Sequence, residues 1–173
     1  MTQAPASGSF HRRHGLMVAA GIAVIDQIVK YVVTNTLELP HRLEGIRITP
    51  FFNLTWAENR GVSMGFFHAD TDLMRWLLVI MTGAIATFVA WWLWREKSRS
   101  DAMALGLILG GAVGNIIDRV RFGYVVDYAD HHIGAWRPFL IFNLADAAIT
   151  FGVLILLARA LLLREKAAPK ESH

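Results

Sequence analysis

Two asparagine–aspartate pairs with the same spacing lie at the edges of apolar segments. Asn115 and Asp118 are three residues apart in GNIIDR, Asn143 and Asp146 repeat the spacing in FNLAD, and Asp127 lies between the pairs in GYVVDY. Two carboxyl groups held close together cannot both ionise easily, so one keeps a proton while the other stays charged. Such a pair can hydrolyse a peptide bond, because the charged member takes a proton from water while the protonated member donates to the substrate carbonyl. The spacing does not decide which two of Asp118, Asp127 and Asp146 form it.

A further polar pair, Asp26 and Lys30, lies in the first apolar segment of the chain. Their separation of four residues places both side chains on one face of a helix, where they can form an ion pair. A paired charge is tolerated in a membrane where a lone charge is not. We expect this pair to stabilise helix packing, to position a substrate, or to do both.

Membrane-spanning helices are predicted to hold these residues. The chain has 173 residues, of which 54% are hydrophobic, more than is usual for a soluble domain. A span needs about 20 mostly apolar residues, and four segments qualify: about 15–34, 73–94, 102–120 and 139–163. We therefore predict an all-α integral membrane protein with one domain over residues 1–173 and disordered tails at 1–12 and 166–173.

Within the third span, Gly106, Gly110 and Gly114 recur at four-residue intervals, which indicates close helix packing.

Basic residues flank the predicted spans on one side of the membrane. They are Arg12, Arg13, Arg95, Lys97, Arg99, Arg164, Lys166 and Lys170. The positive-inside rule therefore places both termini in the cytoplasm. Residues 36–72 and 121–138 then lie outside. In residues 36–72, apolar and polar residues alternate, which predicts a small external β-rich loop domain at about 40–68. On this topology the acids gather near the external face.

Several other chemistries fit the sequence less well. The chain has no cysteine, which excludes thiolate catalysis and thiolate metal sites. Ser63 lies in a GVSMG segment, but that nucleophile motif works on an α/β-hydrolase sheet, for which the chain has no room. His131 and His132 are adjacent without an H-E-x-x-H motif, so no metal site is predicted. Basic and aromatic residues do not interleave, so no nucleic-acid partner is expected.

Two alternatives to an enzyme remain open at this point. Intramembrane acids also build proton or ion pathways, although here the acids gather near one face instead of forming a ladder across the bilayer. A purely structural membrane protein of four helices is the other alternative. It would leave the three acids without an explanation.

Four segments in this order resemble the bacterial lipoprotein signal peptidases, also called signal peptidase II. They are DQIVK in the first span, AENRGVSMGFF in the external loop, GGAVGNIIDRVRFGYVVDY at the end of the third span and FNLADAAI at the start of the fourth. The likeness extends over about residues 15–163. It implies an aspartic endopeptidase of the bacterial inner membrane that needs no cofactor and cuts prolipoproteins just before a diacylglyceryl-modified cysteine.

The resemblance also implies roles for individual residues. Asp127, in the VVD segment, and Asp146, in the NxAD segment, are implied to be the catalytic dyad. The residues implied to support the site or bind substrate are Asp26, Lys30, Asn59, Gly61, Asn115, Asp118, Arg119 and Asn143. We expect an apolar groove open to the bilayer and covered by the 50–68 loop. The expected partners are prolipoproteins that carry a diacylglyceryl cysteine and membrane lipids, and the protein is expected to act as a monomer.

Overall fold

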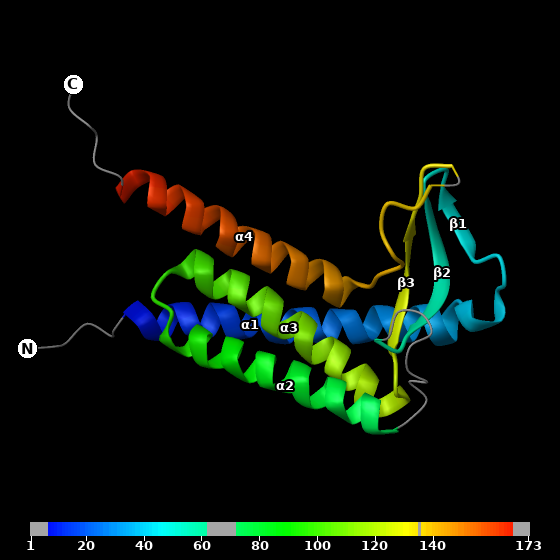
Figure 1. Ribbon diagram of the computed structural model, residues 1–173, viewed down its shortest axis with the longest axis horizontal. Coiled ribbons are helices and arrows are strands. Elements are labelled where there is room, and N and C mark those ends of the chain that lie inside the picture. The colour runs from blue at the N-terminus through cyan, green and yellow to red at the C-terminus, as the bar shows by residue number, and fades with distance from the viewer. Residues whose placement is uncertain (1–6, 62–71, 135, 168–173) are drawn as a thin grey trace, which may run out of the picture.

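A computed structural model of the chain describes residues 7–61, 72–134 and 136–167. Within these residues it contains four long helices and a small antiparallel sheet at one end of them (Figure 1). The helices are α1 (Ser7–Tyr31), α2 (Asp72–Arg95), α3 (Arg99–Phe122) and α4 (Leu144–Ala167). Each of the four is long and apolar enough to cross a membrane. The predicted fold class is confirmed in its four membrane helices and its small β-rich part.

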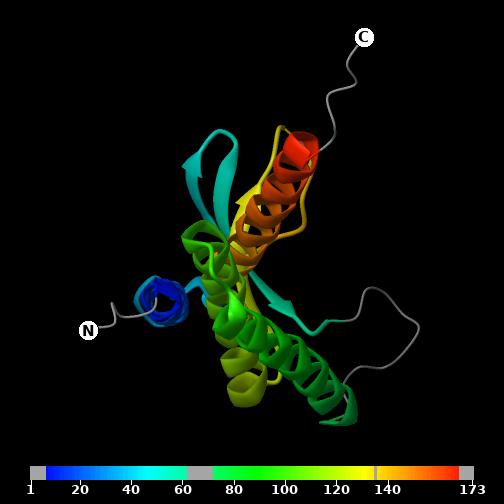
Figure 2. The same ribbon diagram turned by 90° about the vertical axis from the view of Figure 1, so that its left-hand side faces the viewer.

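Helix α3 is the centre of the helical part. It packs against each of the other three helices, whereas α1 makes few contacts with α2 and α4 (Figure 2). Glycines make the close approach possible, since a Cβ atom added at Gly106 would lie 2.3 Å from the carbonyl oxygen of Gly15, and one at Gly110 would lie 2.5 Å from that of Ala19. On the opposite side, a Cβ atom at Gly111 would lie 2.4 Å from the carbonyl oxygen of Ala145 in α4. The glycines of the third span therefore serve packing, as predicted.

The sheet has three antiparallel strands in the order β1–β2–β3. They are β1 (Ile46–Thr49), β2 (Phe52–Asn59) and β3 (Val125–His131). Between α1 and β1 the chain passes through a π-helical turn, η1 (Val32–Thr36), and a 3-10 turn, η2 (Leu39–His41). Strand β3 joins α3 directly through Gly123, whose φ of 84° lies in the left-handed region that ends helices. This short connection brings the acid of β3 to the end of α3.

Two helix boundaries and one strand differ from the predictions. Helix α4 begins at Leu144 instead of residue 139, because the apolar residues before it are extended and Phe142 pairs with Ala129 of β3. Helix α1 begins at Ser7, inside the predicted tail of residues 1–12, and the guanidinium of Arg12 lies 4.6 Å from the ring centre of Trp94. The third strand was not predicted, since its segment was expected only to lie outside the membrane, within residues 121–138. Residues 62–68 of the predicted loop domain, and residues 1–6 and 168–173 of the predicted tails, lie outside the described residues.

Candidate active site

Asp146 is held at the start of α4 by a reciprocal helix cap. Its backbone N–H donates to Oδ1 of Asn143 at 2.9 Å, and the backbone N–H of Asn143 donates to Oδ2 of Asp146 at 3.3 Å. This is the arrangement of a capping box, in which the residue before a helix and the third residue inside it satisfy each other's backbone N–H groups. The Asn-x-x-Asp spacing at 143–146 therefore starts the helix and fixes its acid in the first turn of α4.

Asp127 is buried in β3 and lies beside this cap. Nδ2 of Asn143 donates to Oδ1 of Asp127 at 2.6 Å, and Nδ2 of Asn59 in β2 donates to Oδ2 at 3.1 Å. Asn115 of α3 completes the set, since its Nδ2 donates to Oδ1 of Asp146 at 2.8 Å. Each of the four carboxylate oxygens of Asp127 and Asp146 thus accepts a hydrogen bond, and Asn143 bonds to both acids.

The surroundings raise the pKa of Asp127 to about 6. Burial is the largest cause and the negative charge of Asp146 is the second, while the hydrogen bonds from Asn59 and Asn143 and the charge of Lys30 act in the opposite direction. Burial and a like charge both disfavour ionisation of a carboxyl group. Asp127 therefore keeps its proton to a much higher pH than an ordinary aspartate, as the protonated partner of an acid/base pair must.

Two buried acids outside this pair share one lysine. Nζ of Lys30 lies 2.8 Å from Oδ2 of Asp26 and 2.7 Å from Oδ2 of Asp118, and it donates to Oδ1 of Asn115 at 3.1 Å. The predicted ion pair of Asp26 and Lys30 is therefore present, and Asp118 is its third member. Buried charges of this kind are tolerated only when paired and hydrogen-bonded.

The same two acids hold the backbone next to the central pair. Oδ2 of Asp118 accepts the N–H of Val126 at 3.1 Å, and Oδ1 of Asp26 accepts the N–H of Ala145 at 3.1 Å. Val126 and Ala145 are the residues immediately before Asp127 and Asp146 in the chain. The charge network therefore fixes the positions of both acids through the main chain.

Two openings meet at the acid pair. Asp127 lines a cavity of about 410 Å³ together with polar residues of β2, among them Glu58 and Asn59. Asp146 lines a cavity of about 360 Å³ whose other walls are mainly apolar and include Phe151. Leu140 lines both cavities. A polar cavity lined by Asp127 and a mainly apolar cavity lined by Asp146 therefore adjoin at Leu140.

The remaining predicted residues also lie in this region. The backbone N–H of Gly61 donates to Oδ1 of Asn59 at 2.9 Å. Gly61 therefore holds in place the Asn59 side-chain amide, whose Nδ2 donates to Asp127. Arg119 lies near enough to interact electrostatically with Asp146 and Asp127. Among the described residues, its buried Nε atom has no hydrogen-bond partner.

Sequence reasoning missed Gln27, whose Nε2 donates to Oδ1 of Asp118 at 2.8 Å and to the carbonyl oxygen of Gly114 at 3.3 Å. Its position beside Asp26 in an apolar span was the available signal.

The residues considered for other chemistries do not join the site. His131 contacts the aromatic rings of Phe51 and Phe139, and Ser63 lies outside the described residues. Among the described residues, no group of three or more potential ligands could hold a metal ion.

Comparison with known proteins identifies the family. Residues 18–162 match the family model described as signal peptidase (SPase) II. The chain belongs to the signal peptidase II family. It is 57% identical over 160 residues to the lipoprotein signal peptidase of Sphingopyxis alaskensis, with 92% of each chain covered. It is also 56% identical over 164 residues to that of Rhizorhabdus wittichii, with 95% of each chain covered.

The fold of this signal peptidase II agrees with a solved structure. A bacterial membrane enzyme determined at 2.3 Å resolution superposes with a TM-score of 0.72 at 28% sequence identity, covering 92% of this chain and 93% of that one. The protein is thus a bacterial membrane enzyme, an aspartic peptidase that cleaves prolipoprotein signal peptides. The peptidase prediction is confirmed over the alternative of a proton or ion pathway.

Proposed function

We propose that Asp127 and Asp146 are the catalytic dyad of this signal peptidase II. The observation that carries the proposal is the shared partner: Asn143 donates to Asp127 and forms the reciprocal cap with Asp146, which holds the two carboxyl groups together where the two cavities meet. Asp26, Lys30 and Asp118 line neither of the two cavities at the dyad. Their proposed role is to support the dyad.

In the proposed mechanism Asp127 holds the resting proton, because its pKa is raised to about 6 beside the charge of Asp146. Ionised Asp146 takes a proton from water while the water oxygen bonds to the peptide carbonyl carbon, and Asp127 gives its proton to the carbonyl oxygen. The gem-diol then collapses: Asp146 returns its proton to the leaving amine nitrogen, the C–N bond breaks, and Asp127 regains a proton from a gem-diol hydroxyl group. No covalent intermediate forms, and both acids return to their initial state.

The substrate that fits the two cavities is a prolipoprotein whose cysteine carries a diacylglyceryl group, cut just before that cysteine. The apolar cavity beside Asp146 is suited to the lipid chains, because hydrocarbon is favourable there and water is not. The polar cavity beside Asp127 is suited to the peptide. We assign Asn59, Gly61 and Arg119 to the substrate side of the site. Asn59 and Gly61 line the polar cavity, and Nε of Arg119 has no hydrogen-bond partner in the part of the chain that the structure describes.

The proposed setting is the bacterial cytoplasmic membrane, with both termini inside and the active site near the external face. The basic residues beside the spans support this orientation. All the partners of the dyad come from one chain, so we propose that the enzyme acts as a monomer.

Cleavage of a lipid-modified prolipoprotein by the purified enzyme in detergent, measured as a gel shift, tests the dyad. Asp127→Asn and Asp146→Asn are expected to fold yet release no signal peptide, because an amide cannot exchange the proton. An asparagine at 146 still offers an oxygen to the helix cap, so α4 is kept. The matched control is Asp72→Asn, at an acid whose side chain is 89% exposed, and it should cleave normally. Cleavage by either dyad variant at the wild-type rate would remove that residue from the dyad.

A further inference from the structure

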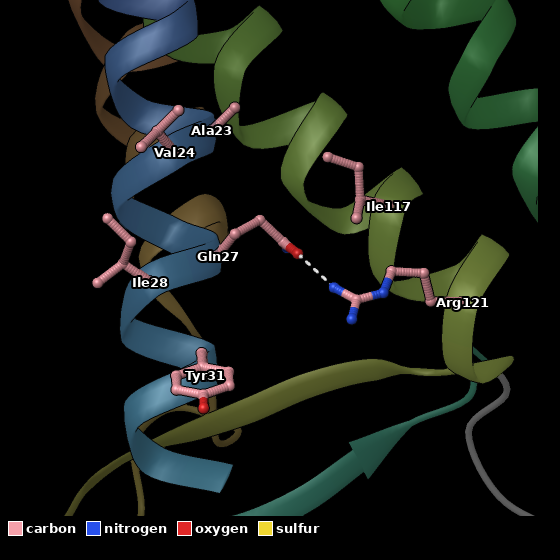
Figure 3. Close-up of a pocket in the computed structure, with 7 residues that line it drawn as sticks. All are labelled: Ala23, Val24, Gln27, Ile28, Tyr31, Ile117 and Arg121. Carbon is pink, nitrogen blue, oxygen red and sulfur yellow. Dashed lines mark hydrogen bonds between the residues drawn. The ribbon is translucent and has the colours of Figure 1, made fainter. Parts of the chain in front are cut away.

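A second groove lies between α1 and α3 and has a volume of about 420 Å³ (Figure 3). Ala23, Val24 and Ile28 line it from α1, and Ile117 and Arg121 line it from α3. None of these residues lines the two cavities at the dyad. The groove is therefore distinct from the proposed active site.

The arrangement of the helices leaves this groove uncovered. Helices α1 and α2 meet near the end opposite the sheet, where Arg12 stacks on Trp94 and Gly15 packs against Leu93. Towards the sheet the two helices separate, as Figures 1 and 2 show. Val24 and Ile28 are more than half exposed. Because α1 and α3 are long and apolar enough to cross a membrane, we expect this part of the surface to face the hydrocarbon of the bilayer.

A cation lies at the outer end of the groove. Arg121 is the residue before the last of α3, and its Nη1 donates to Oε1 of Gln27 at 3.5 Å, across the groove (Figure 3). Its guanidinium also lies 4.8 Å from the ring centre of Phe122. Within the described part of the chain, no carboxylate forms an ion pair with Arg121. The side chain keeps most of its donors for another acceptor.

Beyond Arg121 the groove continues into a smaller polar cavity of about 50 Å³, lined in part by Tyr31, Thr34 and Asn35. Asp118 and Lys30 also line this cavity, and Nζ of Lys30, which Asp118 shares with Asp26, lies 2.7 Å from the Asp118 carboxylate. Hydroxyl and amide groups thus surround the cation at the outer end of two spans. Tyrosine and arginine at this depth are typical of the membrane interface.

We propose that this groove binds a glycerophospholipid, with the phosphodiester on Arg121 and one acyl chain along the apolar wall formed by α1 and α3. The apolar wall alone would accept any lipid chain. The phosphate is the anionic group that a bilayer places at this depth, and guanidinium groups bind phosphate oxygens through paired, charge-assisted hydrogen bonds. A lipid bound there also fixes the position of Gln27, which donates to Asp118, so it acts on the network that supports the dyad.

Native mass spectrometry of the full-length protein in detergent, titrated with phosphatidylglycerol, tests the proposal. Arg121→Gln is expected to weaken binding about tenfold, the loss expected for one charge-assisted hydrogen bond. The matched control is Arg47→Gln, because Arg47 is an exposed arginine of β1 on the same side of the membrane. This variant should bind as the wild type does. A lipid that binds only the folded state also raises the unfolding temperature, so phosphatidylglycerol should stabilise the wild type more than Arg121→Gln.

A second variant and a second ligand complete the test. Ala23→Phe places a ring in the groove and should also reduce binding. Diacylglycerol has the same acyl chains without the phosphate, and it should not displace phosphatidylglycerol at equal concentration. Equal binding by Arg121→Gln and the wild type would overturn the proposal. So would displacement by diacylglycerol, an equal loss in Arg47→Gln, or a dimer of this chain that Ala23→Phe disrupts.

Discussion

Removal of the Asn59 amide should move the pKa of Asp127 in a known direction. Nδ2 of Asn59 donates to Oδ2 of Asp127 at 3.1 Å, and this bond favours the ionised form. Asn59 is exposed, so water replaces part of the bond, and its loss in Asn59→Ala should cost the ionised form about 1 kcal/mol. One pKa unit corresponds to about 1.4 kcal/mol. The pKa of Asp127 should therefore rise by about 0.7 units above its value of about 6.

The pH profile of kcat/KM measures this change, because it reports the ionisation of the free enzyme. The proposed mechanism needs Asp127 protonated, so activity falls as pH rises through the pKa of Asp127. In Asn59→Ala this descending limb should move to higher pH by about 0.7 units. Oδ1 of Asn59 also holds the N–H of Gly61 at 2.9 Å, so the plateau of kcat/KM should fall, and the position of the limb carries the prediction.

The matched control is Asn53→Ala, at an earlier position in the same strand. Within the described part of the chain, Oδ1 of Asn53 is buried without a hydrogen-bond partner, and its substitution should leave the limb in place. A limb in Asn59→Ala that stays at the wild-type pH, or moves to lower pH, would refute the reasoning. It would show that Asp127 is not the group whose proton the reaction needs.

Other predictions concern the dyad and its support. Asp146→Asn removes the like charge beside Asp127, so the pKa of Asp127 should fall, as infrared titration of its carboxyl band can measure. Asp118→Asn weakens a buried ion pair and should reduce the free energy of unfolding by about 2 kcal/mol, as thermal unfolding in detergent can measure. Its activity should fall as well. A fully stable but inactive variant would instead suggest a direct catalytic role for Asp118. Gly111→Ala places a Cβ atom 2.4 Å from the carbonyl oxygen of the residue before Asp146 and should lower stability by about 1–3 kcal/mol, whereas Gly83→Ala, which meets no atom within 4 Å, should not. Cleavage should persist in EDTA, and its inhibition by the chelator would point to a metal that the proposed mechanism does not use.

The spans and the acids near one membrane face could be predicted because hydropathy and residue type are local properties. The choice among the acids could not, since the same Asn-x-x-Asp spacing serves two purposes. At 143–146 it caps a helix, and at 115–118 it lies within a helix, where Asn115 binds Asp146 and Asp118 binds Lys30. Only the three-dimensional arrangement separates these roles. For this chain, the resemblance to a family supplied the choice that spacing left open.

Strand β3 escaped prediction for a physical reason. Six of its seven residues, from Val125 to Asp130, are buried, so the apolar and polar alternation of a half-exposed strand is absent. Its partner β2 also lies far away in the sequence, and Asp127 faces Ala57 across the pair. Pairing over such a distance leaves no local signal, and the environment of the acid could not be foreseen from its neighbours in the chain.

Each oxygen of Asp127 and Asp146 already accepts an N–H group, which comes from Asn59, Asn115 or Asn143. Inhibitors should use the carboxylate oxygens in the same way, as acceptors. A compound whose hydroxyl groups donate to the remaining lone pairs should bind better than one that presents a carbonyl oxygen, which would be repelled by the carboxylate oxygens unless the single dyad proton lies between them.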